Sequence, residues 1–154
     1  MIKTKDNIVI VGFPGIGKSE CEKRNPGKLF FDLESSEYHY DIHGDPLPTE
    51  EWVKKYVDLI KKIVNSEKNG KIILVSSHKE VRDELKRRKI PYIIVMPDRS
   101  DKNEYLKRYL ARKSSMEFIQ KLNNNWEKWI EELILDTAPI IFLSRYSYLS
   151  DIFE

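Results

Sequence analysis

A glycine-rich stretch near the start of the chain, residues 12–19, constrains the fold more than any other feature. It reads Gly-Phe-Pro-Gly-Ile-Gly-Lys-Ser and matches the pattern G-x-x-x-x-G-K-[ST] in full. A β-branched apolar run, residues 8–11, precedes it, and residues 18–23 have room only for a short helix before Asn-Pro-Gly at 25–27. A strand, a loop and a helix in this order predict an α/β protein built on a mainly parallel sheet.

The same arrangement predicts a binding site for a polyphosphate. Backbone N–H groups of the loop and the positive end of the helix converge on one point, where phosphate oxygens can replace water. Gly15 and Gly17 let the backbone close around the phosphates because they carry no Cβ. We expect Lys18 to reach the β- and γ-phosphates of ATP and Ser19 to ligate Mg2+. The predicted ATP-binding residues are Gly12, Phe13, Pro14, Gly15, Ile16, Gly17, Lys18 and Ser19.

The remaining chain alternates apolar runs with amphipathic stretches. The predicted strands are 8–11, 29–32, 71–76, 92–96 and 140–143, and the predicted longer helices are 49 to about 69, 80–89, 101–113 and 114–135. Thr49 is the expected cap of the first of these helices, and capping boxes open the last two, at Asp101 and at Ser114. We therefore expect one α/β domain over residues 1–154, with its ligand site at the carboxyl ends of five strands.

Charge and cysteine content narrow the function classes. The 27 Lys and Arg nearly cancel the 25 Asp and Glu, so no global positive field favours nucleic acid. The only compact basic run, residues 86–89, is interpreted as a solvated helix end. No stretch approaches 18 apolar residues, and the single cysteine, Cys21, cannot form an internal disulfide. We expect a cytoplasmic protein with no membrane association and no nucleic-acid partner.

Three further strings carry a resemblance to a known group of proteins. They are Val-Ser-Ser-His-Lys-Glu-Val-Arg (75–82), Pro-Asp-Arg (97–99) and Asn-Trp-Glu-Lys-Trp-Ile (125–130). With the glycine-rich loop, they resemble small P-loop kinases of phages and prophages, of the adenylate-kinase-like or deoxynucleoside monophosphate kinase type. The resemblance covers most of the chain. It implies a three-layer P-loop NTPase fold with a short helical lid, and a monomer or homodimer in the cytoplasm of a host.

The resemblance also implies an activity, the transfer of the γ-phosphoryl group from ATP–Mg2+ to a (deoxy)nucleoside monophosphate. Such transfer relies on positioning and on cations that stabilise the moving charge. Residues 99–114 hold the place of the lid. There we expect Arg108 and Arg112 to share one helix face with Tyr105, and Arg99 to enter from the lid base. The opposite, apolar face would then consist of Leu106, Tyr109 and Leu110. Alternatively, the two helix arginines form a solvated face that pairs with Glu104.

The metal-side carboxylate is expected at Asp32. The third strand ends Val-Ser-Ser-His at 75–78, without the acid that many P-loop proteins carry there. Asp32 closes the second strand, and with Glu34 it is similar to the Asp-x-Asp of shikimate-kinase-like and gluconate-kinase-like enzymes. Together with Ser19, Asp32 would hold the metal or orient the attacking oxygen. A role as a turn cap is the alternative.

Residues 34–48 are expected to bind the acceptor. The predicted acceptor-binding residues are Asp32, Glu34, Tyr38, Tyr40, Trp52, Ser77 and His78. The alternation of His39, Asp41, His43 and Asp45 is attributed to a turn and not to a transition-metal site. Two other functions stay open. One is a kinase for a hydroxyl on a small metabolite, a polynucleotide or a modified base, with Asp32 as general base, and the other is a protein that binds ATP without transferring phosphate.

Overall fold

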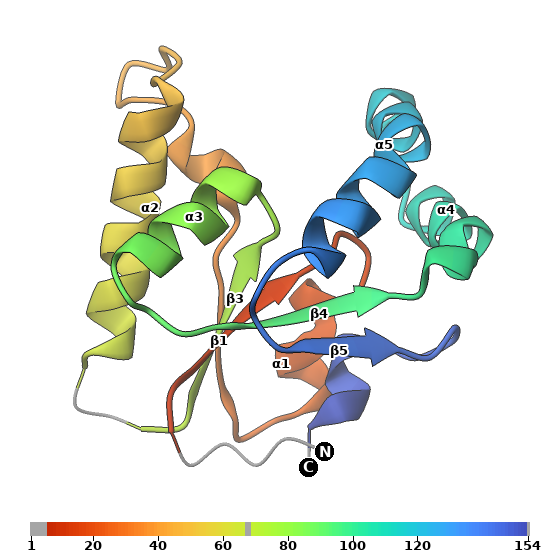
Figure 1. Ribbon diagram of the computed structural model, residues 1–154, viewed down its shortest axis with the longest axis horizontal. Helices are drawn as coiled ribbons and strands as arrows, with labels where there is room; N and C mark the ends of the chain where they lie inside the picture. Colours follow the sequence, from red (N-terminus) through yellow and green to blue (C-terminus); the bar gives the residue numbers. More distant parts are fainter. Residues whose placement is uncertain (1–5, 67–68, 154) are drawn as a thin grey trace.

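A parallel sheet of five strands, in the order β2-β3-β1-β4-β5, forms the centre of the molecule (Figure 1). The computed structural model describes residues 6–66 and 69–153. The strands are β1 (Ile8–Gly12), β2 (Leu29–Asp32), β3 (Lys71–Ser76), β4 (Ile93–Pro97) and β5 (Ile140–Leu143), and every pairing is parallel. All five strands therefore end at the same edge. The predicted α/β fold class is confirmed.

Helices cover both faces of this sheet. They are α1 (Cys21–Arg24), α2 (Thr49–Val64), α3 (Lys79–Arg87), α4 (Lys102–Ala111) and α5 (Met116–Ile134), with 3-10 turns η1 (Lys18–Glu20), η2 (Ser35–Tyr38), η3 (Arg99–Asp101) and η4 (Leu149–Ile152). The connection from β1 to β2 moves across the sheet in one direction, and each later connection between strands moves in the other direction. Because crossovers are right-handed, α1 lies on one face with η4 beside it, and α2, α3 and α5 lie on the other (Figure 1).

The core follows from the apolar pattern of the sequence. The middle residues of β1, β3 and β4 are buried on both faces, as their β-branched runs predict. On α2, the buried side chains recur at helical spacing and face the sheet and α3; they are Trp52, Val53, Tyr56, Val57 and Ile60. This packing fixes the strand ends on which the candidate site is built.

The predicted helix boundaries need correction at three places. α2 ends at Val64, earlier than predicted, and its N-cap is Pro48, so Thr49 is the first helical residue; residues 67 and 68 lie outside the described residues. Asp101 precedes α4 without capping it, because its carboxylate instead pairs with Arg145, 2.8 Å away. The cap of α5 is Ser115, one residue after the predicted Ser114.

The segment after β5 has a structure that the sequence did not indicate. Residues 144–153 pass beside the glycine-rich loop and form η4, with Leu149 and Phe153 buried in the core. Residues 1–5 and 154 lie outside the described residues. Within the described ranges, no helix combines the length and the apolar character that crossing a membrane requires.

Candidate active site

The glycine-rich loop joins β1 to η1 and adopts a conformation that requires glycine at two positions. Gly15 and Gly17 have φ angles of 91° and 94°, in the left-handed region. A Cβ on Gly15 would lie 2.7 Å from the Tyr109 hydroxyl, and one on Gly17 would lie 3.0 Å from the Tyr148 ring. Both glycines are therefore needed for backbone conformation and for close packing behind the loop.

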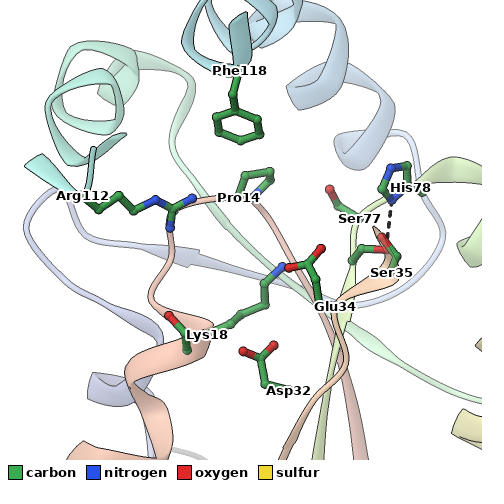
Figure 2. Close-up of a pocket in the computed structure, with 12 residues that line it drawn as sticks. Pro14, Lys18, Asp32, Glu34, Ser35, Ser77, His78, Arg112 and Phe118 are labelled. Carbon is green, nitrogen blue, oxygen red and sulfur yellow. Dashed lines mark hydrogen bonds between the residues drawn. The ribbon is translucent and has the colours of Figure 1, made fainter. Parts of the chain in front are cut away.

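A cavity of about 240 Å3 opens between this loop and the ends of β2 and β3 (Figure 2). Its lining residues are Pro14, Gly15, Lys18, Ser19, Asp32, Glu34, Ser35, Ser76, Ser77, His78, Arg112 and Phe118. They come from the loop, from two strand ends, and from the corner between α4 and α5. The structure thus brings the predicted phosphate loop, the predicted metal carboxylate and part of the predicted acceptor site to one cavity.

Lys18 lies in this cavity with Asp32 and Glu34 near its side chain (Figure 2). Its ammonium group donates to the Gly12 carbonyl at 3.0 Å. Desolvation lowers the pKa of Lys18; the charges of Asp32 and Glu34 oppose this shift, and the charge of Arg112 adds to it. A cation that is poorly hydrated and held beside a loop of backbone amides is well suited to bind a polyphosphate.

Asp32 lies opposite Lys18 at the end of β2. Desolvation raises the pKa of its carboxyl, the charge of Lys18 opposes the rise, and the nearby Glu34 increases it. The Ser19 hydroxyl and the Asp32 carboxylate both line the cavity, and such hard oxygen donors fit Mg2+. Residues 6–66 and 69–153 contain no group of three or more His, Cys, Asp or Glu side chains placed to hold a metal. Two protein oxygens completed by phosphate and water are the usual way to bind this ion.

Tyr56 of α2 holds the ends of β2 and β3 together. Its hydroxyl donates to the Leu33 carbonyl at 2.6 Å and accepts from the Ser76 amide at 3.2 Å. Burial raises the pKa of this phenol, so it stays protonated and keeps both bonds. Its position sets the spacing between the strand end that carries Asp32 and the one that carries Ser77.

Three of the predicted acceptor residues do not line the cavity. Trp52 is buried behind it, with its ring 4.2 Å from the His39 ring and 5.7 Å from the His78 ring. Tyr38 packs on Tyr56, with 5.3 Å between ring centres. Tyr40 is exposed beside the turn at 41–45, where the Asp41 carboxylate accepts from two backbone amides. These three aromatic residues therefore lie around the cavity and not in it, and the predicted acceptor residues that line it are Asp32, Glu34, Ser77 and His78.

The predicted arginine cluster also needs correction. Only Arg112 lines the cavity, where Figure 2 shows its guanidinium directed inward. Arg108 is buried, 7% exposed, and donates to the carbonyls of Gly15, Arg145 and Ser147 instead of facing the cavity. Arg99 is bound to Glu127 and Glu131 of α5.

The physical reason is packing: Arg108 lies against the back of the glycine-rich loop, whereas Arg112, the C-cap of α4, lies past the packed part of the helix. The packed face of α4 is formed by Tyr105, Arg108 and Tyr109, whereas Leu110 is 59% exposed.

Sequence reasoning did not identify several residues of the site. Ser35 and Phe118 line the cavity, and Tyr109, Tyr148 and Leu149 contact the back of the loop. Ser35 follows directly after Glu34, a position that could have suggested it. The contacts of Tyr148 and Leu149 join distant parts of the chain and have no local sequence signal.

Comparisons with known proteins agree with the observed fold. No protein-family model and no curated protein matches the chain. Among solved structures, a gluconokinase from Sinorhizobium meliloti 1021 superposes with a TM-score of 0.56 at 16% identity, covering 98% of this chain and 89% of that one. A tunicamycin resistance protein from Deinococcus radiodurans superposes with a TM-score of 0.53 at 18% identity, covering 96% and 90%. At these identities the likeness shows the fold alone, an α/β fold with a parallel sheet between two layers of helices.

Proposed function

We propose that this protein is an ATP-dependent phosphotransferase. The observation that carries the proposal is the placement of Lys18, in a complete phosphate loop, across one cavity from Asp32 at the end of β2. The Lys18 ammonium group suits the donor phosphates, and the Asp32 carboxylate suits a metal ion or an acceptor. A gluconokinase of the same fold supports a kinase function in general terms. We also propose that residues 34–48 bind the acceptor and that residues 99–114 form a lid.

In this proposal the chain positions the reactants and stabilises charge. The loop amides and Lys18 hold the β- and γ-phosphates of ATP. Ser19 and Asp32 supply oxygen ligands for Mg2+, which neutralises phosphate charge when bound. Arg112 reaches the transferring group from the α4–α5 corner with two parallel donors. Phe118, at the same corner, excludes water from the cavity.

The charges of the cavity favour a hydroxyl as the accepting group. Its cations, Lys18 and Arg112, lie on the loop and at the α4–α5 corner, whereas the β2 end carries two carboxylates, Asp32 and Glu34. A neutral hydroxyl can donate a hydrogen bond to such a carboxylate, and an acceptor phosphate is repelled by it. Asp32, whose pKa is raised by desolvation, would accept the hydroxyl proton. The acceptor oxygen then binds the γ-phosphorus as the bond to the β–γ bridging oxygen breaks and ADP leaves.

A nucleoside monophosphate is the second candidate acceptor. Arg112 favours it, because an exposed guanidinium at a cavity can hold an acceptor phosphate as well as a donor phosphate. The sequence resemblance points to the same substrate class, and within it to a deoxynucleoside monophosphate. In this case transfer needs no strong base, and Asp32 serves the metal alone.

A polynucleotide acceptor finds little support in the surface charge. In the basic run at 86–89, Lys86 is 3.2 Å from Asp136, Arg87 pairs with Glu84, and Arg88 pairs with both Glu84 and Asp58. These cations already have carboxylate partners and offer no open stripe to a phosphate backbone.

The test is turnover with a panel of acceptors. The protein is incubated with ATP–Mg2+ and, in turn, with sugars and sugar acids, nucleosides, ribo- and deoxynucleoside monophosphates, and oligonucleotides, while ADP is measured. Phosphorus NMR of the product separates a phosphate ester from a diphosphate, and so a hydroxyl from a monophosphate acceptor. Lys18→Ala protein is the blank. If ATP binds but no acceptor increases ADP formation, the protein is a nucleotide-binding protein without kinase activity and the proposal fails.

A further inference from the structure

The back of the phosphate loop, on the side that does not line the cavity, is held by three donors from outside the loop. The Tyr109 hydroxyl donates to the Pro14 carbonyl. The Arg108 guanidinium donates to the Gly15 carbonyl at 2.9 Å, and the Leu149 amide donates to the Ile16 carbonyl at 2.7 Å. Three consecutive carbonyls of the loop thus have partners from α4 and from the segment after β5.

Arg108 connects these two supports to each other. Besides Gly15, it donates to the carbonyls of Arg145 and Ser147, at 3.1 and 2.9 Å. Its guanidinium lies between two aromatic rings, 4.3 Å from the centre of the Tyr105 ring and 4.0 Å from that of Tyr148. A buried guanidinium with these partners is fixed in position and has no free fork for a phosphate.

These contacts determine which way the loop amides point. In a trans peptide the carbonyl and the following N–H point in opposite directions. Tyr109 holds the Pro14 carbonyl at the back, and Leu149, whose segment Arg108 supports, holds the Ile16 carbonyl, so the N–H groups of Gly15 and Gly17 face the other way. Backbone amides oriented in this manner are the donors that a phosphate loop offers to its ligand. The Ile16 amide, which follows the carbonyl bound by Arg108, bonds to the Phe13 carbonyl at 3.4 Å. Because Tyr148 fills the space beside Gly17, the segment after β5 also restricts the backbone at this glycine.

We propose that Arg108 is a positioning residue, which braces the phosphate loop from behind together with Tyr109 and residues 144–153, and that nucleotide affinity depends on this brace. The inference rests on the proposed nucleotide-binding function for its ligand, but not for the brace itself. It assigns Arg108 a role behind the loop, in place of contact with the transferring phosphoryl group.

The test measures the loop and the ligand separately. Loop exchange, meaning the amide hydrogen exchange of Ile16 and Leu149, whose N–H groups bond to the carbonyls of Phe13 and Ile16, is recorded on the nucleotide-free protein, and the affinity for ADP–Mg2+ is measured by calorimetry. In Arg108→Ala we expect loop exchange to become about tenfold faster and ADP affinity to fall about tenfold, the size of a lost hydrogen bond to a charged group. Arg108→Lys should give intermediate values, because an ammonium group can serve one carbonyl but not all three and stacks less well on aromatic rings. The Arg108→Lys variant also tests the proposal if Arg108→Ala does not fold.

Arg88→Lys is the matched control. The Arg88 side chain is also largely buried, 12% exposed, and it binds Glu84 at 2.8 Å without contacting the loop or lining the cavity. We expect this variant to melt at a lower temperature with loop exchange and ADP affinity unchanged.

The brace is contradicted if loop exchange in both Arg108 variants stays within about twofold of wild type, or if Arg88→Lys accelerates it equally. Faster loop exchange with unchanged ADP affinity would overturn the claim that nucleotide affinity depends on the brace. Absence of ADP binding by the wild type would refute the proposed function, and the exchange data would still decide whether Arg108 braces the loop.

Discussion

Lys18 is the single side chain on which the proposed chemistry depends most. In Lys18→Ala the mobile cation on the transferring oxygens is lost, and we expect kcat to fall by about a thousandfold with the fold unchanged. Lys23→Ala is the control, because that ammonium is exposed and lies 3.9 Å from Glu20. Steady-state kinetics and circular dichroism are measured on both variants. Activity of folded Lys18→Ala within a few-fold of wild type would rule out the phosphate-loop mechanism.

We expect the ionisation of Asp32 to control how kcat/KM declines at low pH. Desolvation holds the pKa of its carboxyl above the ordinary value, so the ionised form that serves as base or metal ligand is lost as pH falls, earlier than for an exposed aspartate. We expect kcat/KM to decline below this raised pKa, and Asp32→Asn to lower it about a hundredfold and remove the decline.

Asp98→Asn, at the end of β4, is the comparison for Asp32. The Asp98 carboxylate is outside the cavity and binds Ser100, so the pH profile of this variant should match wild type. An unchanged acid side in Asp32→Asn would show that another group controls it.

Two arginines of the predicted lid, one before α4 and one after it, have different surroundings. Arg112 lines the cavity, whereas Arg99 is tied to Glu127 and Glu131. We expect Arg112→Ala to lower kcat by about a hundredfold with little effect on the melting temperature, and Arg99→Ala to leave kcat unchanged. Kinetics at saturating ATP on both variants provide the test. Equal kcat values for the two would remove Arg112 from the site.

Tyr56 links α2 to the ends of β2 and β3, and we expect loss of this link to weaken binding of the acceptor. Tyr56→Phe loses the bonds that its hydroxyl makes with Leu33 and Ser76, which should cost about 1–3 kcal/mol of unfolding free energy. Because those strand ends carry Asp32 and Ser77, we also expect the KM for the acceptor to rise more than the KM for ATP.

Tyr92→Phe is the matched variant for Tyr56→Phe. Its hydroxyl binds only the Asp136 carboxylate among the hydrogen bonds described, and Tyr92 does not line the cavity. It should lose stability without changing either KM. The role of Tyr56 in placing the acceptor would be rejected if both variants shifted the two KM values equally.

The sequence was a good guide to the elements but a poor one to their ends and to what joins them. Apolar periodicity placed all five strands and the longer helices, because burial in a sheet or against it repeats along the chain. It could not show that α4 stops before Arg112, since the stop depends on packing. Nor could it show the partner of Asp101, because Arg145 comes from a distant segment. The phosphate loop was recognisable because its function requires glycine at fixed positions; side chains behind it have no such requirement.

An ion cluster around Asp136 joins α3 to the segments that precede β4 and β5, and so contributes to the stability of the whole molecule. The Asp136 carboxylate binds Arg82 at 2.7 Å and Tyr92 at 2.9 Å, and it accepts from the Ala138 amide. Desolvation would raise its pKa, but these hydrogen bonds outweigh it and hold the pKa at about 2. A lowered pKa stabilises the folded state above pH ~4, the value in the unfolded chain, and this contribution is lost as pH falls toward 2.

We therefore expect Asp136→Asn to lower the unfolding free energy at neutral pH by on the order of 2 kcal/mol and to reduce its dependence on pH in the acid range. Urea unfolding between pH 7 and 3 measures this. Asp83→Asn is the control, since that carboxylate pairs with Lys79 on the exposed surface. A pH dependence that is identical in wild type and Asp136→Asn would show that another group governs acid unfolding.

The bond from the Leu149 amide to the Ile16 carbonyl has a consequence for synthesis on the ribosome. The chain grows from its N-terminus at ~5–20 residues per second, so the glycine-rich loop is synthesised well before its support. A nascent chain that stops before Leu149 contains the complete motif but lacks a donor that orients it. Under the proposed function, ATP therefore stabilises such a fragment less than it stabilises a chain that includes Leu149.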